Sequence, residues 1–124
     1  MWTQNNMNSE PLGSGNSTQQ KSLTNLPVPT ALNWHCEAVC NYDCTFCYAP
    51  FEDQRKRSRL TSEEGCKVIE NLAITGIQKI NFVGGEPMLH PHIQDWIRYS
   101  KKVGMTTSIV SNGTRMDGQF LSDM

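Results

Sequence analysis

The chain has 124 residues and nearly balanced charge, with 11 Lys and Arg against 12 Asp and Glu. This balance gives no electrostatic support for general nucleic-acid binding, and a hydrophobic content of 37% is enough for one modest domain. No apolar run approaches the roughly 20 residues of a membrane span, and the amino terminus lacks the charged and apolar regions of a signal peptide. We therefore expect a cytoplasmic protein that binds neither nucleic acid nor membranes.

The first 26 residues differ in composition from the rest. They are rich in Asn, Ser, Thr and Gln, and their scattered apolar positions show no amphipathic period. Such a segment buries too little apolar surface to offset the entropy of ordering it, so we predict a disordered polar tail over residues 1–26 and a folded part over residues 27–124. A basic cluster from Arg55 to Arg59 is interpreted as a solvated loop face and only secondarily as a phosphate-binding patch.

The folded part begins with a strand and a helix. Residues 31–36 read as a short strand, with prolines marking its entry. A helix is predicted to start at Thr61, because Thr61 and Glu64 form a capping-box pattern ahead of an apolar face at helical spacing. Gly76 is a plausible residue for ending this helix.

The same alternation continues to the end of the sequence. Residues 77–83 read as a second strand, residues 92–103 as a helix that Gly104 ends, and residues 106–110 as a third strand. Residues 114–124 resemble the opening of a third helix. Three successive strand–helix units predict an α/β fold with parallel strands, because each helical crossover returns the chain to the same end of the sheet.

The conspicuous motifs all follow predicted strands. A cysteine-rich segment (residues 40–49) follows the first strand, Gly84-Gly85-Glu86-Pro87 the second, and Ser111-Asn112-Gly113 the third. They should therefore gather at the edge where α/β proteins bind ligands. The two glycines would let the backbone approach a ligand closely, leaving carbonyl groups available to an ammonium group, and Glu86 would place an anion nearby.

Cys40, Cys44 and Cys47 are spaced as C-x3-C-x2-C, followed by the aromatic Tyr48. Three thiolates on one loop suit a [4Fe–4S] cluster in which one iron stays open to a small molecule. The alternative is a zinc site that recruits Cys36, although zinc knuckles usually occur as two C-x2-C pairs. Cys36 and Cys66 are better interpreted as buried packing residues, and five cysteines without a secretory segment favour a reducing compartment over a disulfide framework.

The cysteine spacing and the Gly-Gly-Glu-Pro segment together resemble the radical S-adenosylmethionine (radical SAM) superfamily. The resemblance implies a [4Fe–4S] cluster whose open iron chelates SAM, and a reductive cleavage that releases a 5′-deoxyadenosyl radical. By the same resemblance, Cys40, Cys44 and Cys47 bind the cluster, Tyr48 lies beside the adenine, and Gly84, Gly85 and Glu86 contact the methionyl amine. Ser111 and Asn112 would lie near the SAM carboxylate and ribose.

A narrower resemblance covers about residues 28–116. Asn33-Trp34-His35, the Lys79-Ile80-Asn81-Phe82 strand and the segment from Ser108 to Gly113 look like viperin and its prokaryotic relatives. These antiviral lyases convert a nucleoside triphosphate to its 3′-deoxy-3′,4′-didehydro analogue. The resemblance implies that Asn33 and Lys79 bind the substrate's ribose and triphosphate, and a lysine at a strand start can supply the cation that a triphosphate needs. A solvated lysine remains the alternative.

The family fold implied by this resemblance is a partial (β/α)6 barrel, of which the sequence contains the first three units. We therefore expect a truncated barrel that is inactive, or nearly so, by itself. The implied partners are a nucleoside triphosphate and an electron donor such as flavodoxin or ferredoxin. Two alternatives stay open: another radical SAM branch, such as a peptide-modifying or activating enzyme, and a non-catalytic metal-binding fragment.

Overall fold

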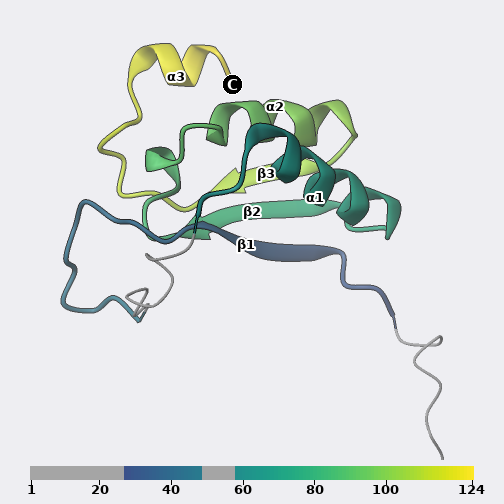
Figure 1. The fold of residues 1–124 in the computed structure, drawn as a ribbon, viewed down its shortest axis with the longest axis horizontal. Coiled ribbons are helices and arrows are strands. Elements are labelled where there is room, and N and C mark those ends of the chain that lie inside the picture. The colour runs from purple at the N-terminus through teal and green to yellow at the C-terminus, as the bar shows by residue number, and fades with distance from the viewer. Residues whose placement is uncertain (1–26, 49–57) are drawn as a thin grey trace, which may run out of the picture.

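The computed structural model describes residues 27–48 and 58–124, so the predicted tail and most of the basic cluster lie outside the described residues. Three strands form one parallel sheet in the order β1-β2-β3, as the alternating pattern predicted. Their bounds are Ala31–Glu37 for β1, Lys79–Gly84 for β2 and Thr106–Ile109 for β3. The arrows in Figure 1 all point the same way, and the chain leaves β1 as a long loop at their carboxyl ends.

Helix α1 (Ser62–Ile74) begins and ends where the sequence predicted. The Thr61 hydroxyl accepts a hydrogen bond from the Glu64 amide, and the Glu64 carboxylate accepts one from the Thr61 amide, so both halves of the capping box are present. At the other end Gly76 adopts φ 96°, a left-handed conformation that glycine takes without strain and that closes the helix.

The later elements match the predicted order with small shifts in their bounds. Helix α2 (Ile93–Lys102) agrees with the prediction, and a short 3-10 turn, η2 (Pro87–Leu89), was not predicted. Helix α3 (Gly118–Ser122) begins later than the predicted residue 114. Its N-cap is Asp117, whose carboxylate accepts from the Phe120 amide, whereas the amide of Thr114 donates to the side chain of Asn112.

The core lies between the sheet and the helices, which occupy one side of it (Figure 1). Ile80, Phe82 and Trp96 are fully buried there, and alternate residues of β1 pack against them. Trp34 stacks on Trp96 with ring centroids 4.8 Å apart. Because side chains alternate along a strand, the residues between these core positions belong to the opposite face of the sheet.

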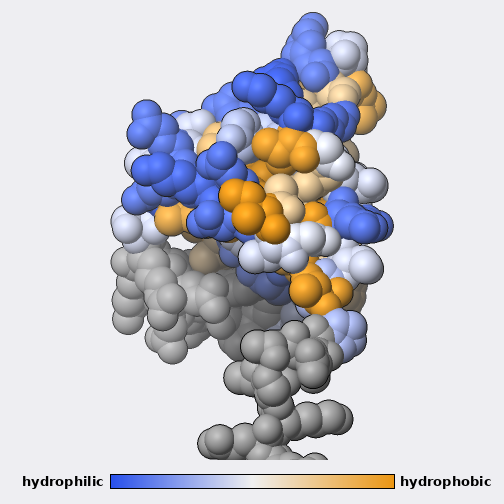
Figure 2. All heavy atoms as spheres, turned by 90° about the vertical axis from the view of Figure 1, so that its right-hand side faces the viewer, coloured by the Kyte–Doolittle hydropathy of each residue, from blue (hydrophilic) through white to orange (hydrophobic). Residues whose placement is uncertain are grey.

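The end of the molecule away from the long loop has no single apolar face. Figure 2 shows apolar side chains there in small patches separated by polar ones. Ile74, at the end of α1, is an exposed apolar residue. None of the helices among the described residues has the length and apolar character needed to cross a lipid bilayer.

Candidate functional site at the strand ends

The structure brings the three sequence motifs together, as predicted. The amide of Gly85 donates to the carbonyl of Glu37 (2.7 Å), which joins the end of β2 to the end of β1. The hydroxyl of Ser111 donates to the carboxylate of Glu86 (2.8 Å), which joins β2 to the segment after β3. The site is thus one continuous set of contacts at the carboxyl edge of the sheet.

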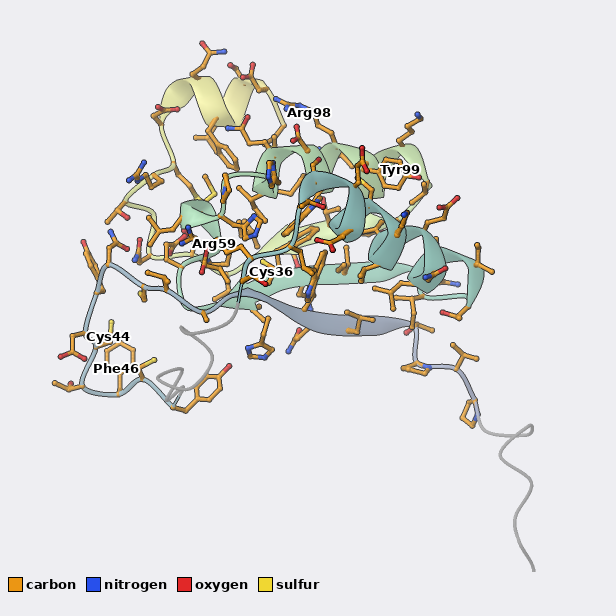
Figure 3. All side chains as sticks on the ribbon, in the orientation of Figure 1. Cys36, Cys44, Phe46, Arg59, Arg98 and Tyr99 are labelled. Atoms are coloured by element: carbon orange, nitrogen blue, oxygen red, sulfur yellow. The ribbon has the colours of Figure 1, made fainter. Side chains whose placement is uncertain are left out.

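The cysteine loop projects from this edge, and Figure 3 shows Cys44 and Phe46 on its outer part. Cys40 and Cys44 are half-buried, Cys47 is exposed, and all are free thiols. A turn links the last two, with the Cys47 amide donating to the Cys44 carbonyl (3.0 Å). Tyr48, predicted to lie beside an adenine, is 83% exposed and so remains accessible for such a contact.

This donor set fits an iron–sulfur cluster chemically, because three unpaired thiols on one accessible loop can each provide a thiolate ligand. Within residues 27–48 and 58–124, however, no three Cys, His, Asp or Glu side chains are gathered closely enough to hold a metal ion. Cluster binding at this loop would therefore require the three thiols to converge, as is common where metal binding is coupled to folding.

Cys36 and Cys66 pack against the core, as the sequence indicated. The Cys36 thiol donates to the carbonyl of Val83 (3.6 Å), and burial raises the pKa of Cys36 to about 12. Burial also raises the pKa of Cys66. Both therefore stay protonated near neutral pH, which disfavours the zinc alternative with Cys36 as the fourth ligand.

The two glycines are needed for contact between backbones. Gly84 has φ 139°, and a Cβ atom there would lie 2.2 Å from the carbonyl oxygen of Glu37. A Cβ atom on Gly85 would lie 2.3 Å from the carbonyl oxygen of Val39. The sequence interpretation assigned this close approach to a ligand, whereas the structure uses it to seat the segment that leads into Cys40.

Glu86 is buried, with 1% of its surface exposed, and its carboxylate accepts three hydrogen bonds. Oε1 accepts from the Met88 amide (2.9 Å) and the Ser111 hydroxyl (2.8 Å), and Oε2 accepts from the Asn112 amide (2.7 Å). A buried carboxylate needs such partners to offset its desolvation. Its visible role is to fix the segment after β3, and the predicted contact with a SAM amine remains an expectation.

Asn112 connects this buried anchor to the cysteine loop. Its side-chain amide donates to the side-chain oxygen of Asn41 (2.9 Å) and lies 4.0 Å from the Cys40 sulfur. Asn41 in turn donates to the Thr114 hydroxyl (2.9 Å). The segment after β3 therefore contacts the loop at its first cysteine, and sequence reasoning missed the part played by Asn41.

On the sheet face opposite the helices, three polar side chains form a row across the strands. Asn33, Asn81 and Ser108 are partners in register. The Asn81 amide donates to the side-chain oxygen of Asn33 (2.8 Å), and the Ser108 hydroxyl donates to the side-chain oxygen of Asn81. The Asn33 oxygen thus accepts a hydrogen bond within the row, and Asn33 is exposed, so its NH2 group can act as a donor. Lys79 is exposed two residues before Asn81.

Two further groups near the loop were not singled out from the sequence. Glu37 is 3% exposed at the end of β1, and Arg59 Nε lies 2.7 Å from its Oε2. Arg59 belongs to the basic cluster interpreted as a solvated loop face, and its side chain is exposed although it also pairs with Glu37; Arg55 to Arg57 lie outside the described residues. An acidic residue at the end of a predicted strand was the available signal for Glu37.

Comparisons with known proteins bear on the family of the chain. The family described as "Radical SAM superfamily" matches residues 38–124. An "S-adenosylmethionine-dependent nucleotide dehydratase" from Flammeovirga pacifica is 41% identical over 73% of this chain and 33% of its own length. A "GTP 3',8-cyclase" from Chlorobaculum tepidum is 40% identical over 67% of this chain and 26% of its own length. The chain thus spans about a third or less of these relatives.

A solved structure supports the fold. The crystal structure of Streptococcus suis SuiB has a TM-score of 0.64 and 17% sequence identity, over 77% of this chain and 21% of that one. At this identity the likeness concerns the fold alone. It agrees with the parallel sheet and its helices as part of an α/β architecture of this kind.

Proposed function

Because the chain belongs to the radical SAM superfamily, we propose that it binds a [4Fe–4S] cluster and SAM and takes part in the dehydration of a nucleoside triphosphate. The observation that carries the proposal is the junction of the cysteine loop, the glycines and the Ser111-Asn112 segment at one sheet edge. Members of this superfamily in general use SAM and such a cluster. When bound, the cluster supplies the electron for the reductive cleavage of SAM.

In this proposal Cys40, Cys44 and Cys47 hold the cluster, and Tyr48 contacts the adenine. Carbonyl groups near Gly84 and Gly85 meet the methionyl amine, with the buried charge of Glu86 behind them. Ser111 and Asn112 are already held in place by Glu86. Polar contacts from them to SAM would therefore cost little further conformational entropy. An exposed loop also leaves room for an electron donor such as flavodoxin or ferredoxin to approach.

The substrate part of the proposal concerns the polar row. Asn33 offers its NH2 group as a donor, and Lys79 adds a cation on the same sheet face, which together suit the acceptor oxygens of a ribose and a triphosphate. The 5′-deoxyadenosyl radical would take the ribose 4′ hydrogen, the 3′ hydroxyl would leave and take up a proton as water, and a second electron would complete the 3′-deoxy-3′,4′-didehydro product.

The proposal is tested with the product of the complete gene, reduced anaerobically with SAM. Nucleoside triphosphates should accelerate the formation of 5′-deoxyadenosine, and deuterium from the ribose 4′ position should appear in it. Asn33→Asp is the sharpest variant, because a carboxylate can still accept from Asn81 but presents no donor. It should weaken nucleotide binding about tenfold or more, since a hydrogen bond to a charged group contributes about 1.5–3 kcal/mol.

A second candidate is another radical SAM branch. The similarity to a GTP 3',8-cyclase at 40% identity favours keeping it, since that relative is also named for a nucleotide substrate. The two reactions differ in product: dehydration removes a water molecule, whereas a cyclisation retains every heavy atom of the nucleotide. Mass spectrometry of the product separates them. No acceleration by CTP, GTP, UTP or ATP would refute both nucleotide reactions.

A further inference from the structure

The cysteine loop is joined to the fold by a buried carboxylate that the proposed chemistry does not use. Glu37 is the last residue of β1, and the register of β1 against β2 shifts between His35 and Glu37. Such irregularities re-aim side chains at the end of a strand. Only 2% of the Glu37 side chain is exposed, and a buried carboxylate is costly unless it is paired and hydrogen-bonded.

Glu37 shapes the backbone that leads into the first cysteine. Its Oε1 atom accepts from the amides of Ala38 and Val39, both at 2.9 Å. The same segment is held from the other side, because the Glu86 amide donates to the Val39 carbonyl (2.8 Å). The chain is therefore fixed on both sides immediately before Cys40.

The other oxygen of Glu37 reaches the far end of the loop. Arg59 Nε lies 2.7 Å from Oε2, and Arg59 stands three residues before α1 starts at Ser62. Figure 3 shows Arg59 at the base of the loop, apart from the outer Cys44. One ion pair thus joins Glu37, three residues before Cys40, to Arg59, which precedes α1.

His90, buried nearby, does not replace Arg59 as the countercharge. Burial lowers the pKa of His90 below its ordinary 6.5, against a smaller opposite effect of Glu37. The imidazole is therefore neutral at neutral pH, and Arg59 provides the positive charge that the Glu37 carboxylate needs.

We propose that the Glu37–Arg59 ion pair is a positioning pair that closes the base of the cysteine loop, so that its three thiols converge on a cluster and keep it. Joining the ends of a loop lowers the entropy lost when groups within it are brought together. The proposal rests on the proposed cluster site, but not on the identity of the substrate.

The test measures iron release from the anaerobically reconstituted full chain to a chelator. Glu37→Gln keeps an acceptor for the two amides but removes the charge and places an NH2 group opposite Arg59, and Arg59→Ala removes the partner. Each should release iron about 10- to 100-fold faster than the parent, as expected for groups that orient metal ligands. The double variant should be no faster than the single ones, and Arg59→Lys should recover part of the loss.

A matched control is Arg98→Ala, which removes an exposed ion pair with Asp95 on α2 (4.0 Å) and should leave iron release unchanged. Thermal unfolding of the metal-free variants separates positioning from general stability. If the pair acts by positioning, the rate of iron release should not follow the unfolding temperature across three variants: Arg59→Lys, Arg59→Ala and Arg98→Ala. Parental release rates in both Glu37→Gln and Arg59→Ala, or additive effects in the double variant, would overturn the proposal. If the unsubstituted protein bound no iron, the proposed cluster site itself would be wrong. If only the nucleotide assay failed, this proposal would stand.

Discussion

The strand-end anchors and the cysteine loop are opposite in character although they touch. Glu37 and Glu86 are buried carboxylates whose oxygens accept amide and hydroxyl hydrogen bonds or face an arginine. On the loop, by contrast, Cys47 is exposed, and Phe46 is 88% exposed. The groups proposed to do chemistry thus lie on a more exposed segment, and the buried anchors beneath it supply its position. Binding at the loop should therefore depend strongly on the buried residues beneath it.

The largest expected effect comes from a close backbone contact between the two regions. Gly85→Ala places a Cβ atom 2.3 Å from the Val39 carbonyl oxygen, and backbone cannot move aside as a flexible side chain can. We expect it to lower the free energy of unfolding by about 2–3 kcal/mol and to impair cluster assembly as well. Urea unfolding and iron analysis measure the two effects.

Gly118→Ala is the matched control, because nothing lies within 4 Å of a Cβ atom there. Alanine is also the better helix former, so this variant should be neutral or slightly stabilising. If Gly85→Ala left the unfolding free energy as unchanged as Gly118→Ala, the proposed packing of the loop segment against the end of β2 would be wrong.

Glu86→Gln tests the anchor of the segment after β3. The amide can accept from only one side, so the Asn112 amide would face an NH2 group instead of a carboxylate oxygen. We expect a loss of about 1.5–3 kcal/mol in unfolding free energy together with weaker SAM binding in calorimetry. The exposed Glu70→Gln on α1 should change the unfolding free energy by less than about 0.5 kcal/mol. Equal unfolding free energies of the two variants would show that the Glu86 hydrogen bonds do not stabilise the fold.

The smallest effect is a pH dependence that belongs to His90, a buried residue of the folded part, and not to the loop. Burial holds the pKa of His90 below 6.5 in the folded state, so the unfolded chain binds more protons in that range. The free energy of unfolding should therefore fall as the pH drops through about 6.5, and it should level off below the folded-state pKa. His90→Gln should flatten this part of the profile in urea unfolding. An identical slope in parent and variant would assign it to other groups.

The sequence predicted the loop and the elements better than it predicted the anchors. Apolar periodicity and the capping box located α1, and the position of three motifs after three strands predicted their meeting. The predicted start of α3 was wrong because the Thr114 amide donates to the side chain of Asn112, a local contact that apolar periodicity does not reveal. Glu37 and Arg59 are far apart along the chain, and their ion pair follows from burial at the strand end, which no local pattern encodes.

The central claim is that the exposed loop and its buried anchors form an iron–sulfur site, and metal analysis of cysteine variants tests it most directly. After anaerobic reconstitution the parent should hold about four irons and four sulfides per chain, as a [4Fe–4S] cluster requires. Cys40→Ala, Cys44→Ala and Cys47→Ala should each abolish it, while Cys66→Ala, whose thiol packs against the core, should retain it. Stoichiometric zinc in the parent, or a cluster retained when all three loop cysteines are replaced, would contradict the account.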